Sequence, residues 1–386
     1  MSISYWLDSS SKKEFQYDVV IVGAGIAGVS TAYWLEKSFP DIKIALIERN
    51  KMGFGASGRN AGFVTCGSAE HFDKLNKNFG IEKATEIWRF SEINRELLSD
   101  HIIQNDPDSV LFKSTGSCTV APSETDWQRY QDLAQIMKNQ GIDVELIESE
   151  TMAKDYGVKN FKGGIQYKHD GVVHPIRLLK KIFAHLSRTT LFENEEVFHI
   201  EDQSLETDKH RFKAQHLILT LNPYLSLLDP RFATHLKPQR GQVFVSEPLP
   251  AFVKGPCYLT KHLCYFRQMP TGELLIGGFR NVDLENENTF LDQATEKIQT
   301  ALLDFSKNYF GFGDKIKVKY QWSGIMGFTE DGQMLLGHHP RFSNVLLMAG
   351  CSGHGMGLSF HAAKTLVHSL SGKEIPSHLD VKRIKF

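Results

Sequence analysis

Long apolar runs, a signal peptide and an excess of either charge are all missing from this chain of 386 residues. No apolar run approaches the ~18 residues that a transmembrane helix requires. Residues 1–16 are polar and mixed in charge, without the apolar core of a signal peptide. Lysine and arginine number 44 against 45 for aspartate and glutamate, so the net charge of −1 gives no strong field for nucleic acid or an anionic membrane. We therefore expect a cytoplasmic protein with no strong nucleic-acid or membrane partner.

Cysteine is scarce as well, which argues against a disulfide framework and suits a reducing compartment. The five cysteines are scattered and lack the CxxC spacing of zinc sites: Cys66, Cys118, Cys257, Cys264 and Cys351. Their default interpretation is that of small buried hydrophobic residues.

Histidine spacing argues against a metal site. His354, His361 and His368 recur every seven residues, which on a helix separates them by ~10 Å, whereas facing ligands need i, i+4 spacing. The adjacent His338 and His339 point apart on regular structure. We expect no catalytic metal.

The most informative stretch that is present runs from residue 17 to residue 48. Residues 17–22 are typical of a buried strand, residues 26–38 of a helix and residues 43–47 of a second strand. The first strand runs into a GxGxxG loop, and an acid follows twenty residues after its third glycine. This combination predicts a dinucleotide-binding βαβ unit, with an ordinary buried βαβ unit as the alternative.

Each position of this motif has a physical role in binding a dinucleotide. Gly23 permits a sharp turn, Gly25 lets the backbone approach a pyrophosphate, and Gly28 lets the helix pack against the sheet. The first N–H groups of the helix, at Ile26 and Ala27, can hold the phosphates. Glu48, followed by Arg49, can accept hydrogen bonds from a ribose, and its charge disfavours the 2′-phosphate of NADP.

A second glycine loop, Gly353-His354-Gly355-Met356-Gly357, follows the apolar run 344–350 and precedes a helical stretch that starts at Leu358. It repeats the arrangement of strand, glycine loop and helix N-terminus. Such an N-terminus stabilises negative charge, for example at the N1–C2=O edge of a reduced flavin. A plain glycine-rich turn is the alternative.

Strand-like and helical segments alternate between these two loops, which predicts an α/β fold. Helical stretches are expected at about 80–100, 124–140 and 176–186, and runs of strand character at 117–121, 197–200, 216–220, 241–245 and 274–278. We expect a Rossmann-like dinucleotide-binding domain made of residues 1–78, 170–222 and 320–386. A β-rich α+β substrate domain, residues 79–169 and 223–319, is inserted into it.

Further motifs extend over nearly the whole chain: Ser4-Tyr-Trp-Leu, Gly55-Ala-Ser57-Gly-Arg59-Asn60-Ala61-Gly62, Asp170-Gly-Val-Val-His-Pro175, Glu196-Val197, Pro238-Gln-Arg240-Gly241-Gln, Tyr265-Phe-Arg267, Trp322-Ser-Gly324-Ile-Met326 and the loop at Gly353. In this order they are specific. The chain resembles FAD-dependent oxidoreductases of the D-amino acid oxidase superfamily, in the branch of glycine, sarcosine and γ-glutamylputrescine oxidases.

The resemblance implies a GR2-type flavoprotein with non-covalent FAD. Ser57, Asn60 and Ala61 would lie near the pyrophosphate and flavin, the Val197 backbone near the adenine, and Gly353–Leu358 against the flavin ring. The implied reaction is oxidation of a C–N bond of a small amine or amino acid by hydride transfer to flavin N5. The product imine hydrolyses, and oxygen or another electron acceptor reoxidises the flavin.

Departures from the family pattern concern the substrate. The resemblance implies that amino acid oxidases hold the substrate carboxylate with an arginine where this chain has Met326, and that sarcosine oxidase uses a lysine where it has Gly357. The cysteine that attaches flavin near Gly324 and the oxygen-activating lysine in the strand at 274–277 are missing too. We expect a specificity different from that of a D-amino acid, glycine or sarcosine oxidase.

Arg267 and Arg280 are the candidate substitutes for the missing carboxylate anchor, since a guanidinium binds a carboxylate through two parallel hydrogen bonds. Arg267 is the stronger candidate because it shares an aromatic strand with Tyr265. His354 is a further candidate for a polar role beside the flavin. A solvated or structurally paired side chain is the alternative for each.

Three classes of function fit the sequence. The first is an FAD-dependent oxidoreductase of small amines or amino acids, acting as oxidase or dehydrogenase. The second is a flavin enzyme acting on a modified uridine in tRNA, which the lack of a basic stripe disfavours. The third is a non-catalytic dinucleotide-binding regulator, which the presence of the substrate-domain segments disfavours.

Overall fold

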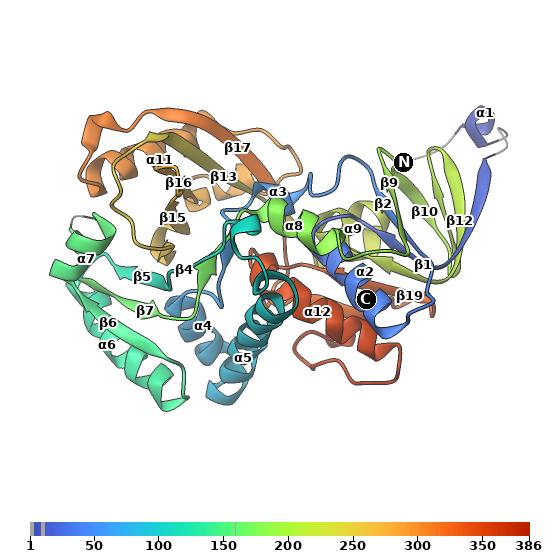
Figure 1. The fold of residues 1–386 in the computed structure, drawn as a ribbon, viewed down its shortest axis with the longest axis horizontal. Helices are drawn as coiled ribbons and strands as arrows, with labels where there is room; N and C mark the ends of the chain where they lie inside the picture. Colours follow the sequence, from blue (N-terminus) through green and yellow to red (C-terminus); the bar gives the residue numbers. More distant parts are fainter. Residues whose placement is uncertain (1–3, 9–11, 159) are drawn as a thin grey trace. The chain divides into compact units, whose positions relative to one another are not determined.

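A computed structural model describes residues 4–8, 12–158 and 160–386. The chain forms two compact units, each built from separate pieces (Figure 1). Unit 1 contains Met1–Gly58, Leu178–Pro238 and Met326–Phe386, and unit 2 contains Arg59–Arg177 and Gln239–Ile325. The domain boundaries expected from the sequence differ from the bounds of these two units, and the expected domains stay a prediction. Part of the expected polar segment 1–16, namely residues 1–3 and 9–11, lies outside the described residues.

Unit 1 is organised around an eight-stranded sheet. Its strands are β1 (Lys13–Val22), β2 (Ile44–Glu48), β9 (Thr189–Glu193), β10 (Val197–Ile200), β11 (Ser204–Thr207), β12 (His210–Leu219), β18 (Leu335–His338) and β19 (Val345–Ala349). The order is β10-β11-β12-β1-β2-β9, and β19 pairs with the second half of β12 and with β18. The pairs among β12, β1, β2 and β9 are parallel, as is β12 with β19. This parallel core confirms the Rossmann-like α/β class.

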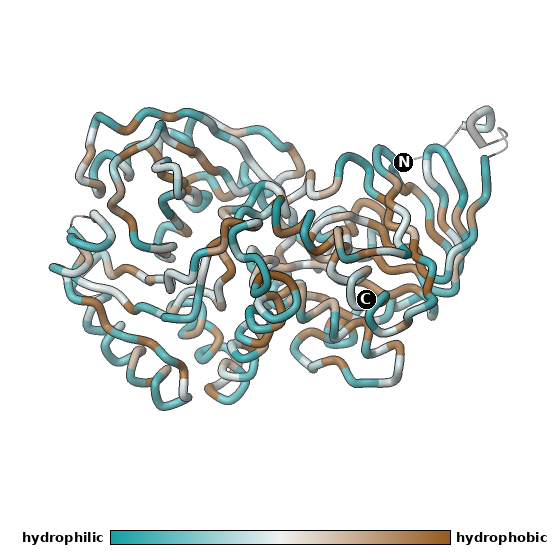
Figure 2. Tube along the Cα trace, in the orientation of Figure 1, coloured by the Kyte–Doolittle hydropathy of each residue, from teal (hydrophilic) through white to brown (hydrophobic). Residues whose placement is uncertain are grey.

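Helices α2 (Ile26–Ser38) and α12 (Gly355–Ser369) pack on each other and on this sheet (Figure 1). The Trp34 indole N–H donates to the Phe360 carbonyl at 2.9 Å, which joins the two helices. Both are apolar on most of their surface because each is covered by the other and by strands. Figure 2 shows that hydrophobic residues are also concentrated in the strands of unit 1. The starts of the two helices, where the glycine loops lie, are therefore held by a buried core.

Short helices complete unit 1. They are α1 (Tyr5–Asp8), α9 (Leu225–Leu228), and α3 (Ala56–Arg59) and α8 (Pro175–Phe183), both of which cross a unit boundary. No helix among residues 4–8, 12–158 and 160–386 is long and apolar enough to cross a lipid bilayer.

Unit 2 contains a second eight-stranded sheet and a small one. The strands are β3 (Phe63–Val64), β4 (Lys113–Ser114), β5 (Ser117–Ala121), β6 (Val144–Glu148), β7 (Gly163–Tyr167), β8 (Gly171–Val172), β13 (Lys237–Pro248), β14 (Cys257–Leu259), β15 (Cys264–Gln268), β16 (Glu273–Gly277) and β17 (Val318–Phe328). The large sheet has the order β17-β13-β16-β15-β14-β5-β7-β6, and the small sheet the order β3-β8-β4.

Alternation along β15 separates the two faces of the large sheet. Phe266 is buried in an apolar core with Phe244 of β13 and Ile276 of β16, against helix α11 (Glu296–Tyr309). Because successive strand residues point to opposite faces, Tyr265 and Arg267 lie on the other face. The remaining helices of unit 2 are α4 (Ala69–Phe79), α5 (Ile81–Leu98), α6 (Glu124–Asn139), α7 (Ser149–Tyr156) and α10 (Leu284–Glu287).

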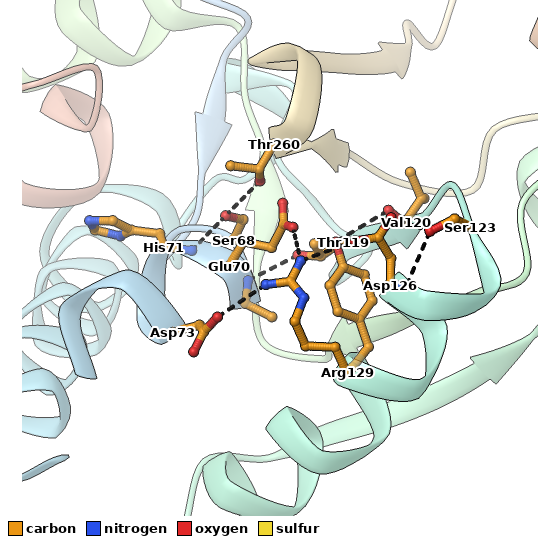
Figure 3. A network of polar contacts seen from close by, with 12 residues as sticks. Ser68, Glu70, His71, Asp73, Thr119, Val120, Ser123, Asp126, Arg129 and Thr260 are labelled. Carbon is orange, nitrogen blue, oxygen red and sulfur yellow. Dashed lines mark hydrogen bonds and ion pairs between the residues drawn. The ribbon is translucent and has the colours of Figure 1, made fainter. Parts of the chain in front are cut away.

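Arg129 of α6 ties part of this unit together (Figure 3). Its guanidinium pairs with Glu70 and Asp73 of α4, at 2.5 and 3.0 Å, and with Asp126 of its own helix. Ser68 caps α4, because its hydroxyl accepts a hydrogen bond from the His71 N–H at 3.0 Å. The sequence analysis missed α4, which Gly80 separates from α5.

Candidate functional site

The glycines of the GxGxxG loop of unit 1 lie in closely packed or unusual surroundings. A Cβ atom at Gly28 would lie 1.9 Å from the Gly23 carbonyl oxygen, and one at Gly25 would lie 2.8 Å from Ser57 Oγ. Gly23 has a φ of +102°, a conformation that side chains rarely adopt. The turn expected at Gly23 and the close packing expected at Gly28 match this geometry, and the approach of a pyrophosphate to Gly25 stays a prediction.

Thr220, at the end of β12, fixes this loop from the neighbouring strand. Its hydroxyl lies 2.9 Å from the Val22 carbonyl oxygen and 2.8 Å from that of Gly23. A Cβ atom at Gly28 would also lie 2.8 Å from Thr220 Oγ1. The sequence analysis missed Thr220 as part of the site, because the parallel pairing of β12 with β1 is not visible in the sequence.

Glu48 anchors the same loop. Its Oε2 accepts a hydrogen bond from the Ala24 N–H at 3.1 Å, and its Oε1 accepts one from the Asn50 N–H at 3.0 Å. A carboxylate has about four acceptor positions, so these bonds leave positions for a ribose hydroxyl. The neighbouring Arg49 lies 4.2 Å from the centre of the Tyr224 ring and 3.8 Å from Glu196 Oε1.

Ser57 provides the cap that helix α2 lacks in its own sequence. Gly25 is the N-cap residue and has no side chain, and Ser57 Oγ accepts the Ile26 N–H at 2.8 Å. The next N–H groups, of Ala27 and Gly28, have no acceptor within a regular helix. A helix start with free N–H groups and a glycine cradle fits the diphosphate of a dinucleotide.

Asn222 organises the second glycine loop of unit 1. Its Oδ1 accepts hydrogen bonds from the Gly350 and Cys351 N–H groups, at 3.1 and 3.2 Å. It has a φ of +49°, and a Cβ atom at Gly327 would lie 2.7 Å from the same oxygen. The sequence analysis also missed Asn222, although an asparagine ahead of a proline can indicate a special turn.

His354 is the N-cap residue of α12, and its side chain makes no hydrogen bond to the first turn of that helix. Its N–H donates to the Cys351 carbonyl at 2.8 Å. Gly355, Met356, Gly357 and Leu358 form the first turn of α12, in which the Gly357 N–H donates to the His354 carbonyl at 2.9 Å. Met326 lies beside the loop, 3.9 Å by its sulfur from the position of a Cβ atom at Gly353.

Val197 opens β10 at the edge of the same sheet, opposite Thr207 of β11. Asn60 and Ala61 lie in unit 2. Asn60 Oδ1 accepts the Gly62 N–H at 2.7 Å, which closes a tight turn, and Ala61 packs with Val243 and Leu275. The contacts of these three residues are compatible with the roles that the resemblance implies, which remain predictions.

Tyr265 and Arg267 of unit 2 lie together on one apolar face, together with Met269. Around them this face carries Ala61, Phe63, Val243, Val245, Leu275 and Trp322. Gly277 makes room for Tyr265, because a Cβ atom there would lie 2.6 Å from the tyrosine hydroxyl. Burial raises the pKa of Tyr265 to about 12, so its hydroxyl stays protonated near neutral pH.

Arg267 and Arg280 have different surroundings. Arg267 is 6% exposed, and its Nη2 donates to the Val173 carbonyl at 3.2 Å. Burial lowers the pKa of Arg267 to about 10, which still leaves it charged near neutral pH. Arg280 is half-buried and donates from Nε to Gln239 Oε1 at 3.2 Å. Burial lowers the pKa of Arg280 too, although Tyr265 opposes this shift.

Asp170 is a buried acid directly before β8. Its Oδ1 accepts the Cys66 N–H at 3.1 Å, and its Oδ2 accepts the Ser117 hydroxyl at 2.6 Å. Burial raises the pKa of Asp170 to about 7, against the opposite effect of these hydrogen bonds.

Cys66 is one of four buried cysteines, and Cys351 is half-buried; all five are free thiols. No group of three or more metal-ligating side chains is found in the described part of the chain.

Comparison with known proteins identifies the family. The family model described as FAD dependent oxidoreductase matches residues 18–369. A similar protein is the probable oxidoreductase OrdL of Haemophilus influenzae, 27% identical over 96% of this chain and 88% of its own length. Gamma-glutamylputrescine oxidoreductase of Escherichia coli is 24% identical over 92% of this chain and 84% of its own length.

Among solved structures, glycine oxidase from Geobacillus kaustophilus has the same fold, with a TM-score of 0.79 and 21% identity over 94% of this chain and 96% of that chain. The fold, the glycine cradle at α2 and the free helix N-terminus agree with the cofactor of the matched family. The chain therefore belongs to the family of FAD-dependent oxidoreductases.

Proposed function

We propose that the enzyme oxidises a carbon–nitrogen bond of a small amine or amino acid and passes the electrons to oxygen or another acceptor. The observation that carries this proposal is the face around Tyr265, where apolar side chains of several strands gather around a buried phenol. Hydride removal from a neutral amine needs alignment and exclusion of water but little acid–base chemistry. The names of the relatives above, which include a gamma-glutamylputrescine oxidoreductase, support the same reaction class.

The residues of unit 1 would hold the cofactor. The N–H groups at the start of α2, with Ser57, would bind the diphosphate, and Glu48 would bind the ribose with the acceptor positions that Ala24 and Asn50 leave. When bound, FAD supplies the acceptor for the hydride from the substrate carbon. The positive end of the α12 dipole would stabilise negative charge next to the first turn of this helix.

The face in unit 2 would bind the substrate. Tyr265 and the apolar side chains around it would exclude water and favour the unprotonated form of the amine, because a low dielectric disfavours a charged ammonium group. After oxidation the imine is hydrolysed by water to a carbonyl compound and ammonia or an amine. His354 would provide a polar group at the start of α12.

An anaerobic bleaching screen tests this function. The purified holoprotein is mixed with primary amines, N-methyl amino acids and D- and L-amino acids, and flavin absorbance is followed before and after oxygen is admitted. We expect bleaching by at least one group of amines, and the rate of recovery in oxygen separates an oxidase from a dehydrogenase. A protein that binds FAD but is bleached by none of these compounds would contradict the proposal.

A further inference from the structure

Arg59 and Asp292 form a partly buried ion pair within unit 2. The guanidinium Nη2 of Arg59 lies 2.7 Å from Asp292 Oδ2, and the two side chains are 20% and 36% exposed. The other carboxylate oxygen, Oδ1, accepts a hydrogen bond from the Ser323 hydroxyl at 2.7 Å. Fully exposed ion pairs contribute little, because water and salt screen them and they cost side-chain entropy. A shielded pair that a third group also binds keeps a definite geometry.

The backbone and the aliphatic stem of Arg59 contact strand β17. The Arg59 carbonyl accepts a hydrogen bond from the Trp322 indole N–H at 2.9 Å. A Cβ atom at Gly324 would lie 3.0 Å from Arg59 Cβ, so glycine at this position leaves room for the arginine stem. Because strand residues alternate, Trp322 and Gly324 point to one face of β17 and Ser323 points to the other. β17 lies at the edge of the large sheet, so Arg59 can reach from the Trp322 face to the carboxylate that Ser323 binds.

Trp322 belongs to the face on which Tyr265 lies. Its side chain packs against the same apolar cluster as Tyr265 and Phe63. An indole covers a large area, and a hydrogen bond to its N–H fixes the direction of the ring. The orientation of Trp322 on this face therefore depends on the position of the Arg59 carbonyl, and the ion pair with Asp292 holds Arg59 in place.

The segment that carries Asp292 is itself fixed to the sheet. Arg240 of β13 binds both oxygens of the buried Glu287, at 3.0 and 2.7 Å, and Gln242 of the same strand donates to this carboxylate. Arg240 also donates from Nη1 to the Leu291 carbonyl at 3.3 Å. Asp292 follows Leu291 directly and is therefore a fixed anchor for the guanidinium that it binds.

We propose that Arg59 and Asp292 are positioning residues of the enzyme, whose ion pair orients Trp322 on the Tyr265 face and thereby determines how tightly a substrate binds there. This inference rests on the proposed function and names two residues that act on the substrate through another side chain. The guanidinium and the carboxylate are engaged with each other and need not contact the substrate. Their effect is large because a displacement of about 1 Å at a site that aligns the substrate costs up to roughly 100-fold in rate.

Kinetics on the holoenzyme test this role. The values of kcat and KM are measured with the compounds that bleach the flavin in the screen described above. Arg59→Met keeps the apolar stem, and Asp292→Asn keeps a hydrogen-bond acceptor for Ser323. Both are expected to raise KM by roughly 10-fold to 100-fold and to change kcat less. Arg59→Lys retains a cation and should recover part of the wild-type KM.

A double-mutant cycle tests whether Arg59 acts through Trp322. Trp322→Phe removes the indole N–H and should raise KM to a similar extent. If the ion pair acts through this indole, Arg59→Met/Trp322→Phe raises KM no further than Trp322→Phe alone. Full additivity of the two changes would overturn the inference. Arg188→Met, the matched control, breaks an exposed ion pair with Asp41 and should leave KM unchanged.

Tryptophan fluorescence tests the orientation of Trp322 without turnover. The holoproteins are titrated with acrylamide, and the contribution of Trp322 is the difference between each protein and its Trp322→Phe counterpart. We expect quenching of Trp322 to increase in Arg59→Met and in Asp292→Asn, while Tm changes little and Arg59→Lys stays close to the wild type. If Arg59→Met does not fold, Asp292→Asn gives the same comparison, because it preserves the volume of the side chain.

The two kinds of measurement separate this inference from the proposed function. If no compound of the screen bleaches the flavin, the proposed function fails, whereas increased quenching of Trp322 still supports the positioning role. If quenching of Trp322 is the same in the wild type and in the folded variants, the inference is refuted, whatever happens to KM.

Discussion

Replacement of Gly28 by alanine tests whether close packing of the first glycine loop holds both the fold and the cofactor. The added methyl group would lie 1.9 Å from the Gly23 carbonyl oxygen and 2.8 Å from Thr220 Oγ1. Non-bonded carbon and oxygen atoms stay at least about 3 Å apart. The start of α2 and the end of β1 would therefore have to separate by about 1 Å.

The cost follows from two contributions. Forcing a methyl group into a well-packed site costs about 1–3 kcal/mol. Separation also disturbs the hydrogen bonds from Thr220 to Val22 and Gly23, each of which contributes about 1 kcal/mol. We expect the free energy of unfolding of the apoprotein to fall by about 2–4 kcal/mol, which lowers Tm by roughly 2–5 °C.

Two other glycines of the same region provide comparisons. Alanine at Gly25 meets the hydroxyl of Ser57, which can rotate away at the cost of its bond to the Ile26 N–H, so the apoprotein should lose only about 1 kcal/mol while FAD affinity falls. Alanine at Gly55 meets nothing within 4 Å and should leave apoprotein stability unchanged. Thermal unfolding of the apoproteins and FAD titration by fluorescence give the two quantities separately.

The three variants make the packing argument refutable. If Gly28→Ala retained the Tm and FAD affinity of the wild type, the close contact with Gly23 could not be a constraint on the loop. If Gly25→Ala and Gly28→Ala lost the same amount of apoprotein stability, the distinction between a rigid carbonyl and a mobile hydroxyl would be wrong.

Three further predictions concern other parts of the two units. Asn222→Gly keeps the positive φ but removes the acceptor for Gly350 and Cys351, so FAD retention and the flavin reduction potential should change. Asn222→Ala should in addition lower the free energy of unfolding by about 1 kcal/mol, the cost of an unfavourable φ, and equal Tm values for the two variants would contradict this. Arg240→Met leaves Glu287 buried without its cation and should lower the free energy of unfolding by about 3–5 kcal/mol in urea, whereas the double variant Arg240→Met/Glu287→Leu should recover part of the loss. Burial raises the pKa of Asp170 from 3.8 to about 7. Between these pH values the folded state therefore binds more protons than the unfolded state. The stability that protonated Asp170 contributes is lost as the pH rises from about 3.8 through about 7. The stability of Asp170→Asn relative to the wild type should therefore rise with pH over this window, by up to about 4 kcal/mol, and a constant difference would show that Asp170 does not titrate there.

Local sequence patterns predicted several elements closely. Helix α2 starts and ends at the expected residues, Ile26 and Ser38, because a glycine loop precedes it and its apolar residues leave no doubt about burial. Strand β5 also matches the expected range 117–121. In contrast, α4 was missed, although Ser68 as a cap and the helical spacing of Phe72 and Leu75 were visible in the sequence.

Some residues of the candidate site were likewise predicted from the sequence and others were not. The glycines and Glu48 were recognisable because a dinucleotide loop has a fixed local spacing. Thr220 and Asn222 were not, because they act on residues more than one hundred positions away, through pairings that no local pattern contains. Arg267 was recognised as a candidate, but only the structure shows that its guanidinium is buried and donates to the Val173 carbonyl.

The sequence by itself determined the family, the cofactor and the outline of the α/β fold, because glycine spacing and hydrophobic periodicity are local properties of the chain. Tertiary structure alone decided which distant side chains complete each loop and which charged side chains pair with one another. Hydrogen bonding and ion pairing depend on distances in space, and those distances exist only after the separate pieces of chain have come together.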